Sequence, residues 1–130
     1  KISELGLTNS VLLLGKRSDT LILNSMSDIA FSRGFGTETI EHLRAGLPVF
    51  SFNTDGAAEI INNGVINGGI FDFSQKEQMA SEIISLARDR TKLDMLRSNA
   101  ARSIAGRYTF QDEASVWRAL YRKVICNDSY

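Results

Sequence analysis

The sequence of 130 residues predicts an α/β fold: a parallel sheet of about four strands, helices on both faces and a helical C-terminal tail. Two observations support this prediction. Short, wholly apolar runs alternate with helix-like segments, which is typical of strands buried on both faces of a parallel sheet. From residue 74 onward, apolar residues instead recur at helical spacing. We therefore expect a single domain, residues 1–130, in which residues 74–125 form the tail.

Four apolar runs are the predicted strands. They comprise residues 11–14 (VLLL), 29–31 (IAF), 49–52 (VFSF) and 69–71 (GIF). Gly15 ends the first run. Pro48 precedes the third, a position where the missing N–H of proline is tolerated. Each run is short enough for a strand, and helix-like segments separate them.

Three predicted helices lie between these strands. Residues 21–27 are weakly helical, and residues 57–61 form a short helix. The helix at residues 37–45 has clearer boundaries, because Thr37 is a good capping residue and Gly46 allows a left-handed stop. This alternation of strand and helix favours a parallel sheet.

The tail is predicted to hold three more helices. Ser74 and Glu77 have the spacing of a capping box at the start of the first, the second begins near residue 91, and the third follows residue 109. Each helix carries an apolar stripe expected to pack: Met79, Ile83 and Ala87; Leu93, Leu96, Ala100 and Ile104; Ala114, Trp117, Tyr121 and Val124.

The composition excludes several classes of function. Fifteen basic residues balance fifteen acidic ones, so no overall field attracts nucleic acid. The single cysteine, Cys126, excludes an internal disulfide, and the single histidine, His42, leaves no histidine-based metal site. Both residues are read as structural. Without a secretory signal or an apolar run of about 20 residues, a cytoplasmic protein is expected.

The segment between the second predicted strand and its helix has the chemistry of an anion site. Gly34 and Gly36 let the backbone approach a ligand, and the helix start offers unpaired amides to a phosphate. Glu38 and Glu41 follow on the first turns, where they could accept hydrogen bonds from sugar hydroxyls or only complement the helix dipole. A structural turn is the alternative for the glycines. A second polar loop, residues 53–56, should open on the same edge of the sheet and form a cleft with the first.

These motifs, in this order and spacing, resemble the carboxy-terminal half of a family-four glycosyltransferase with the two-domain GT-B architecture. The matching stretches are GFG at 34–36 with Glu41, AGLPV at 45–49 and GAAEII at 56–61. Weaker similarity extends to VLLLG at 11–15, SDI at 27–29, residues 64–71 and YTF at 108–110, so it covers nearly the whole chain.

The resemblance implies a partial Rossmann-like, donor-binding domain for a nucleotide-sugar. Gly34, Phe35, Gly36, Thr37 and Glu38 would meet the donor sugar and diphosphate, Glu41 the ribose, and Gly15, Lys16 and Arg17 the base. The family's chemistry is retaining sugar transfer to a glycan, lipid or protein acceptor, with neither cofactor nor bound metal. The implied partners are the nucleotide-sugar and an amino-terminal acceptor domain. Peripheral membrane contact of a longer parent protein is also expected.

Two departures from the family pattern qualify these expectations. Arg33 stands where the family has a glutamate. It could hold a phosphate or carboxylate bidentately, or be a surface arginine without a partner. Arg33 and Glu41 are the candidate catalytic residues, and a degenerate, non-catalytic relative is the alternative function. In addition, the first strand–helix units of the domain are missing. We therefore expect the isolated chain to be inactive and its incomplete sheet to favour self-association.

Overall fold

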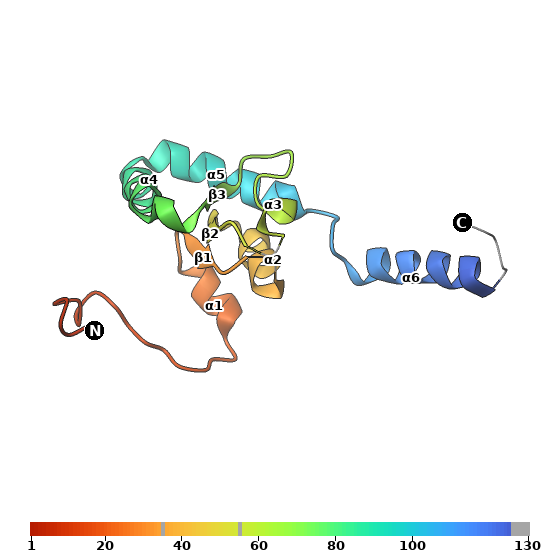
Figure 1. Ribbon diagram of the computed structural model, residues 1–130, viewed down its shortest axis with the longest axis horizontal. Coiled ribbons are helices and arrows are strands. Elements are labelled where there is room, and N and C mark those ends of the chain that lie inside the picture. Colours follow the sequence, from red (N-terminus) through yellow and green to blue (C-terminus); the bar gives the residue numbers. More distant parts are fainter. Residues whose placement is uncertain (35, 55, 126–130) are drawn as a thin grey trace.

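The computed structural model of the protein describes residues 1–34, 36–54 and 56–125, and Figure 1 shows their arrangement. Phe35, which the resemblance places at the donor site, and Cys126 lie outside the described residues. In chain order the elements are α1 (Thr20–Ser25), β1 (Ala30–Ser32), α2 (Thr37–Arg44), β2 (Val49–Phe52), α3 (Ala57–Ile60), β3 (Gly68–Phe71), the 3-10 helix η1 (Phe73–Gln75), α4 (Lys76–Arg88), α5 (Arg90–Ile104) and α6 (Phe110–Ile125).

The sheet is parallel and has the order β1-β2-β3, which confirms the predicted α/β class. Phe31 lies beside Phe50, and Val49 beside Gly68. β2 and β3 approach closely at Gly68, where a Cβ atom would stand only 2.7 Å from the backbone carbonyl carbon of Val49. Glycine is therefore required at this position.

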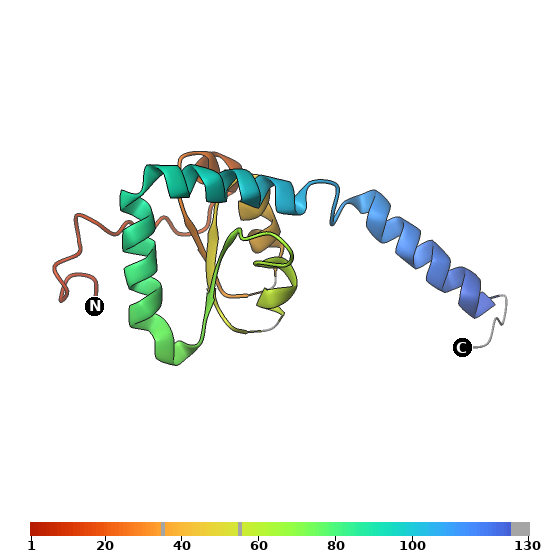
Figure 2. The same cartoon turned by 90° about the horizontal axis from the view of Figure 1, so that it is seen from above.

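Helices cover both faces of the sheet, as predicted (Figure 2). On the face that we call the α2 face, Val49 packs in a core with side chains of α2 and α3, among them Leu43 and Ile60. On the opposite face, the α4 face, Phe50 and Phe71 pack against α4 and the first half of α5. Because neighbouring residues of a strand point to opposite sides, Val49 and Phe50 of β2 enter different cores.

Helix α5 lies across the amino-terminal ends of the strands. Its Asn99 Nδ2 donates to the carbonyl of Ile66, just before β3, at 2.9 Å. Arg97 Nη1 donates to the carbonyl of Ser27, before β1, at 3.1 Å. The predicted stripe of α5 is buried: Leu93, Leu96, Ala100 and Ile104. Since α5 covers one end of the sheet, the carboxyl end is left for a site.

The prediction of a strand at residues 11–14 is wrong. In the residues that the structure describes, the sheet has three strands, and these four residues have no regular structure. Leu12 and Leu13 are 78% and 83% exposed. Figure 1 shows residues 1–19 as a segment without helix or strand that leads away from the sheet and curls at its amino-terminal end. An apolar run becomes a buried strand only beside a hydrogen-bonding neighbour, and the described part of the chain places none there.

The structure also corrects three local expectations. Thr37 does not cap α2, because Gly36 occupies the N-cap position and offers no side chain. The capping box before α4 is formed by Asp72 and Gln75 instead of Ser74 and Glu77. On α4 it is Leu86, not Ala87, that joins Met79 in the core. The prediction that a glycine in the left-handed conformation ends α2 is confirmed, since Gly46 has φ +75°.

Helix α6 forms where it was predicted but does not pack in the core. None of its described residues is buried, and Trp117 and Tyr121 of its apolar stripe are 49% and 59% exposed. Thr109 and Asp112 exchange hydrogen bonds at its start, which cap the first turn. Figures 1 and 2 both show α6 projecting from the rest of the molecule.

Candidate functional site

The candidate site lies at the carboxyl end of β1, where the chain turns into α2. Gly34 has φ +141°, a conformation that glycine adopts far more readily than other residues. Gly36 is extended and leaves the amino terminus of α2 without a side-chain cap. The first backbone donations to the carbonyl of Gly36 come from Thr39 and Ile40. The amides of Thr37 and Glu38 are thus presented at the helix start, as an anion site requires.

A buried hydrogen-bond network fixes this turn. The Gly34 N–H donates to Ser32 Oγ at 3.3 Å, and the Thr39 hydroxyl donates to the Gly34 carbonyl at 2.6 Å. The hydroxyls of Ser32 and Thr39 are 2.5 Å apart, and both side chains are buried. β1, the turn and α2 are therefore tied together on the α2 face, and the turn is preorganised.

Thr54 joins the turn to the loop after β2, which confirms that the two loops open on the same edge. Its hydroxyl donates to the carbonyl of Arg33. A Cβ atom at Gly34 would lie 2.8 Å from this hydroxyl oxygen, so the two backbones can approach only because residue 34 is glycine. Asp55, the next residue of the second loop, lies outside the described residues.

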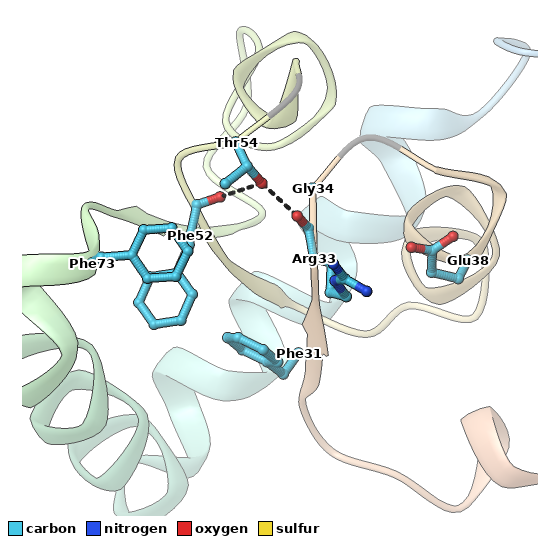
Figure 3. A pocket seen from close by; sticks show the side chains of 7 residues that line it. All are labelled: Phe31, Arg33, Gly34, Glu38, Phe52, Thr54 and Phe73. Atoms are coloured by element: carbon cyan, nitrogen blue, oxygen red, sulfur yellow. Dashed lines mark hydrogen bonds between the residues drawn. The ribbon is translucent and has the colours of Figure 1, made fainter.

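A cavity of about 600 Å³ opens at this edge (Figure 3). It is lined by residues of both loops, of α2 and of the strand ends: Phe31, Arg33, Gly34, Glu38, Phe52, Thr54 and Phe73. Ligand sites in parallel sheets lie at this edge. The volume is within the range of small-molecule sites.

One wall of the cavity is aromatic. The rings of Phe52 and Phe73 stack with centroids 4.4 Å apart, and Phe31 meets Phe52 edge-on at 5.7 Å. Phe31 is 52% exposed. It belongs to the α4 face, but α4 packs over β3 and leaves β1 uncovered on that side. The aromatic wall thus results from a helix that covers only part of the sheet.

Arg33 and Glu38 are the charged residues among those that line the cavity. In the described part of the chain, the Arg33 guanidinium has neither an ion pair nor a hydrogen bond. The Glu38 side chain folds back over the amino terminus of α2, so that its Cδ would lie 2.8 Å from a Cβ placed on Gly36. In Figure 3 the Arg33 side chain lies between Phe31 and Glu38.

The other predicted site residues do not line the cavity. Glu41 is exposed on α2, one turn beyond Glu38. Gly15, Lys16 and Arg17 are exposed on the segment that leads away from the sheet. There Arg17 pairs with Asp19 at 2.5 Å, and this hydrogen bond lowers the pKa of the Asp19 carboxyl.

His42 is half-buried between α1 and α2, and it does not line the cavity either. Its Nδ1 lies 3.0 Å from Asn24 Oδ1. Burial lowers the pKa of the imidazole, and the charges of Glu38 and Glu41 partly oppose this shift. Among the described residues no three His, Cys, Asp or Glu side chains are grouped to hold a metal ion. No described helix is long and apolar enough to cross a membrane.

The sequence analysis missed the aromatic wall and Thr54. A signal for the wall was present, because a phenylalanine lies within two residues of the carboxyl end of each strand: Phe31, Phe52 and Phe73. Read singly, each phenylalanine is an ordinary core residue, and only the strand order brings the three together.

Comparisons with known proteins agree with this architecture. The family described as glycosyl transferases group 1 matches residues 1–103. Anabaena Alr3699/HepE, solved in complex with UDP-glucose, is 28% identical and superimposes with a TM-score of 0.78 over 91% of this chain. No curated protein sequence matches.

Two further solved structures share the fold at lower identity. Staphylococcus aureus TarM is 22% identical, with a TM-score of 0.81 over 92% of this chain. A glycosyltransferase from Rickettsia africae is 21% identical, with a TM-score of 0.79 over 95%. The chain spans 35% of the length of HepE, 25% of TarM and 34% of the Rickettsia protein.

The family match over residues 1–103 and the shared fold confirm the resemblance stated from the GFG, AGLPV and GAAEII motifs. The chain belongs to the glycosyl transferases group 1 family and represents part of a carboxy-terminal GT-B domain.

Proposed function

We propose that this chain is the donor-side part of a glycosyltransferase and binds a nucleoside diphosphate sugar at the carboxyl edge of its sheet. One observation carries the proposal. The cavity opens at the turn between β1 and α2. Hydrogen bonds of Ser32 and Thr39 fix this turn, and the amino terminus of α2 that follows it has no side-chain cap. The complex of HepE with UDP-glucose supports a uridine donor.

The amino terminus of α2 would hold the diphosphate. The amides of Thr37 and Glu38 and the helix dipole favour an anion there. The Glu38 carboxylate now covers Gly36, so it would turn outward when a diphosphate binds. Once turned, it could accept hydrogen bonds from the hydroxyls of the sugar.

The remaining roles are proposed for the longer protein. Glu41 would hold the ribose hydroxyls, and Gly15, Lys16 and Arg17 would approach the base. The transfer would retain the anomeric configuration without a bound metal, with Arg33 and Glu41 near the reacting groups. Since the chain spans only about a third of the length of HepE, we expect the chain alone to bind the donor without transferring sugar.

Titration of the ¹⁵N-labelled chain with UDP, GDP and ADP tests donor binding. We expect one nucleotide to shift the amide signals of Gly36, Thr37 and Glu38, because the diphosphate would accept their N–H groups. Uridine, guanosine and adenosine are the controls without phosphate and should leave these amides unshifted. If all three diphosphates leave these signals in place, donor binding by this chain is disproved.

Paired variants separate the ribose role of Glu41 from a general loss of charge. Glu41→Gln should weaken binding of the preferred nucleoside diphosphate about fivefold, because the ribose hydroxyls would lose one charge-assisted hydrogen-bond acceptor. Glu59→Gln removes an exposed carboxylate from α3, which does not line the cavity, and is the matched control. Equal affinities of the two variants would exclude a ribose contact by Glu41.

The free guanidinium of Arg33 also motivates a second candidate function, a non-catalytic relative that keeps the fold. Arg33→Glu, made in the longer protein, distinguishes the two. Gain of sugar transfer would support a degenerate relative, whereas loss of transfer would assign Arg33 a working role.

A further inference from the structure

Arg33 presents an uncompensated positive charge at a defined place in the cavity. In residues 1–34, 36–54 and 56–125, no carboxylate pairs with its guanidinium, whereas Arg17, Arg90 and Arg97 each pair with an aspartate. An arginine that lines a cavity and has no partner of its own is available to a ligand. The charge therefore belongs to the ligand-binding surface.

The backbone of Arg33 is held in place. Its carbonyl accepts the Thr54 hydroxyl, and the following residue, Gly34, packs against Thr54 and is bound by Thr39. The guanidinium thus extends from a fixed point at the end of β1. The fixed base limits where the guanidinium can reach, and its planar fork suits a bidentate contact.

The surroundings of Arg33 suit a sugar ring better than a phosphate. Phe31, Phe52 and Phe73 offer ring faces and edges against which the C–H groups of a pyranose can pack. These apolar rings also displace water, which strengthens an ion pair formed beside them. The donors suited to a phosphate, the amides of Thr37 and Glu38, lie on α2 and not on this wall.

We propose that Arg33 selects a donor whose sugar carries a carboxylate, as the uronic acids do. The proposal rests on the function proposed above and names the class of sugar. The sugar ring lies against the aromatic wall, and its carboxylate accepts two parallel hydrogen bonds from the guanidinium. A neutral hexose fills the same space but leaves Arg33 without a counter-charge.

Matched donors test this selection by calorimetry on the 130-residue chain. UDP-glucuronate and UDP-glucose differ only at C6, as do GDP-mannuronate and GDP-mannose, and UDP and GDP are titrated alongside. We expect the uronate of the preferred base to bind about tenfold more tightly than its neutral partner, a factor equivalent to about 1.4 kcal/mol. Arg33→Gln should abolish this ratio and weaken binding of the plain diphosphate much less than binding of the uronate.

Two more variants complete the design. Arg33→Lys keeps the charge but loses the planar fork, so the preference should fall to about threefold. Arg88→Gln removes an exposed arginine from the last turn of α4, outside the cavity, and should keep the full preference.

The outcomes separate this inference from the proposed function. Equal binding of the uronate and the hexose by the wild-type chain overturns the selection by Arg33, while diphosphate binding still stands. If Arg33→Gln weakens the plain diphosphate as strongly as the uronate, Arg33 holds phosphate and the inference is wrong. If none of UDP, GDP and ADP binds, the proposed function and this inference are overturned together.

Discussion

At the scale of single residues, Asn67 holds together the loop that leads into β3. Its side chain is completely buried. The amide donates to Ser103 Oγ at 2.9 Å and to the Ile60 carbonyl at 3.3 Å, and its oxygen accepts the Asn62 N–H at 2.8 Å. One side chain thus satisfies three polar groups, and its hydrogen bonds to Ser103 and Ile60 are buried.

Asn67→Ala should lower the free energy of unfolding by about 3 kcal/mol, because buried donors and acceptors lose their partners. Asn63→Ala is the control, since Asn63 makes one exposed hydrogen bond, to the Glu59 carbonyl. Urea unfolding of both variants measures the difference. Similar losses in the two variants would show that burial of Asn67 is unimportant.

His42 gives the protein a pH dependence. Burial lowers the pKa of the folded imidazole below the value of about 6.5 expected in the unfolded chain. Protonation therefore favours the unfolded state, so this contribution to stability is present above pH 6.5 and is lost as the pH falls below it. The pH range of this effect follows from the direction in which the pKa of His42 is shifted.

Thermal unfolding of the wild-type protein and His42→Gln at pH 7.5 and 5.5 checks this sign. The wild-type protein should lose more stability between the two pH values than the variant, which has no titrating group at position 42. Asp112 is no complication, because its lowered pKa places its titration below this range. An equal loss in both proteins would assign the pH dependence to other groups.

At the scale of elements, the pairing of β2 with β3 depends on a close approach of the two backbones. Gly68 lies beside Val49 in the register, and a Cβ atom there would stand 2.7 Å and 2.9 Å from the carbonyl carbon and the nitrogen of Val49. Backbone atoms of a central strand cannot move aside without breaking the ladder. The strand pair therefore tolerates no side chain at this point.

Gly68→Ala should destabilise the protein by about 3 kcal/mol, the upper end of the range for overpacking. Gly69→Ala is a matched control on the same strand. Its added Cβ meets ring atoms of Phe71 and Phe50, at 2.7 Å and 3.0 Å, and these side chains can shift. Chemical unfolding should therefore rank Gly68→Ala as the less stable variant, and the reverse order would contradict the register of β2 and β3.

At the scale of the whole molecule, the chain exposes much more surface than a compact protein of its size. Its accessible area is 9563 Å², whereas a compact protein of 14.4 kDa exposes about 6,800 Å². The excess agrees with the segment of residues 1–19, which leads away from the sheet, and with the projecting helix α6 (Figure 1). Stability therefore resides in the sheet with α2 to α5.

A shortened chain of residues 19–109 should keep the stability of the full chain within about 0.5 kcal/mol, because none of the described residues that it removes, 1–18 and 110–125, has a buried side chain. Leu96→Ala in either chain is the reference for a true core loss and should cost about 3 kcal/mol. Parallel urea unfolding curves measure both. A large loss on shortening would show that residues 1–18 or α6 pack against the body.

Elements whose signals are local could be predicted from the sequence. The strands at 29–31, 49–52 and 69–71 and the helices that follow them form within one or two residues of their predicted bounds. The adjacency of the two loops also followed, since the carboxyl ends of parallel strands share one edge. The motifs were sufficient for the family, because they lie within residues 1–103, which match it.

Whether an apolar segment is buried or exposed depends on the tertiary structure. Residues 11–14 and the stripe of α6 have the pattern of buried segments, yet both are exposed. Conversely, Phe31, Phe52 and Phe73 have the pattern of core residues and form the wall of a cavity. The spacing of apolar residues shows which face of a segment is apolar. Whether that face is buried depends on the neighbouring elements that can cover it.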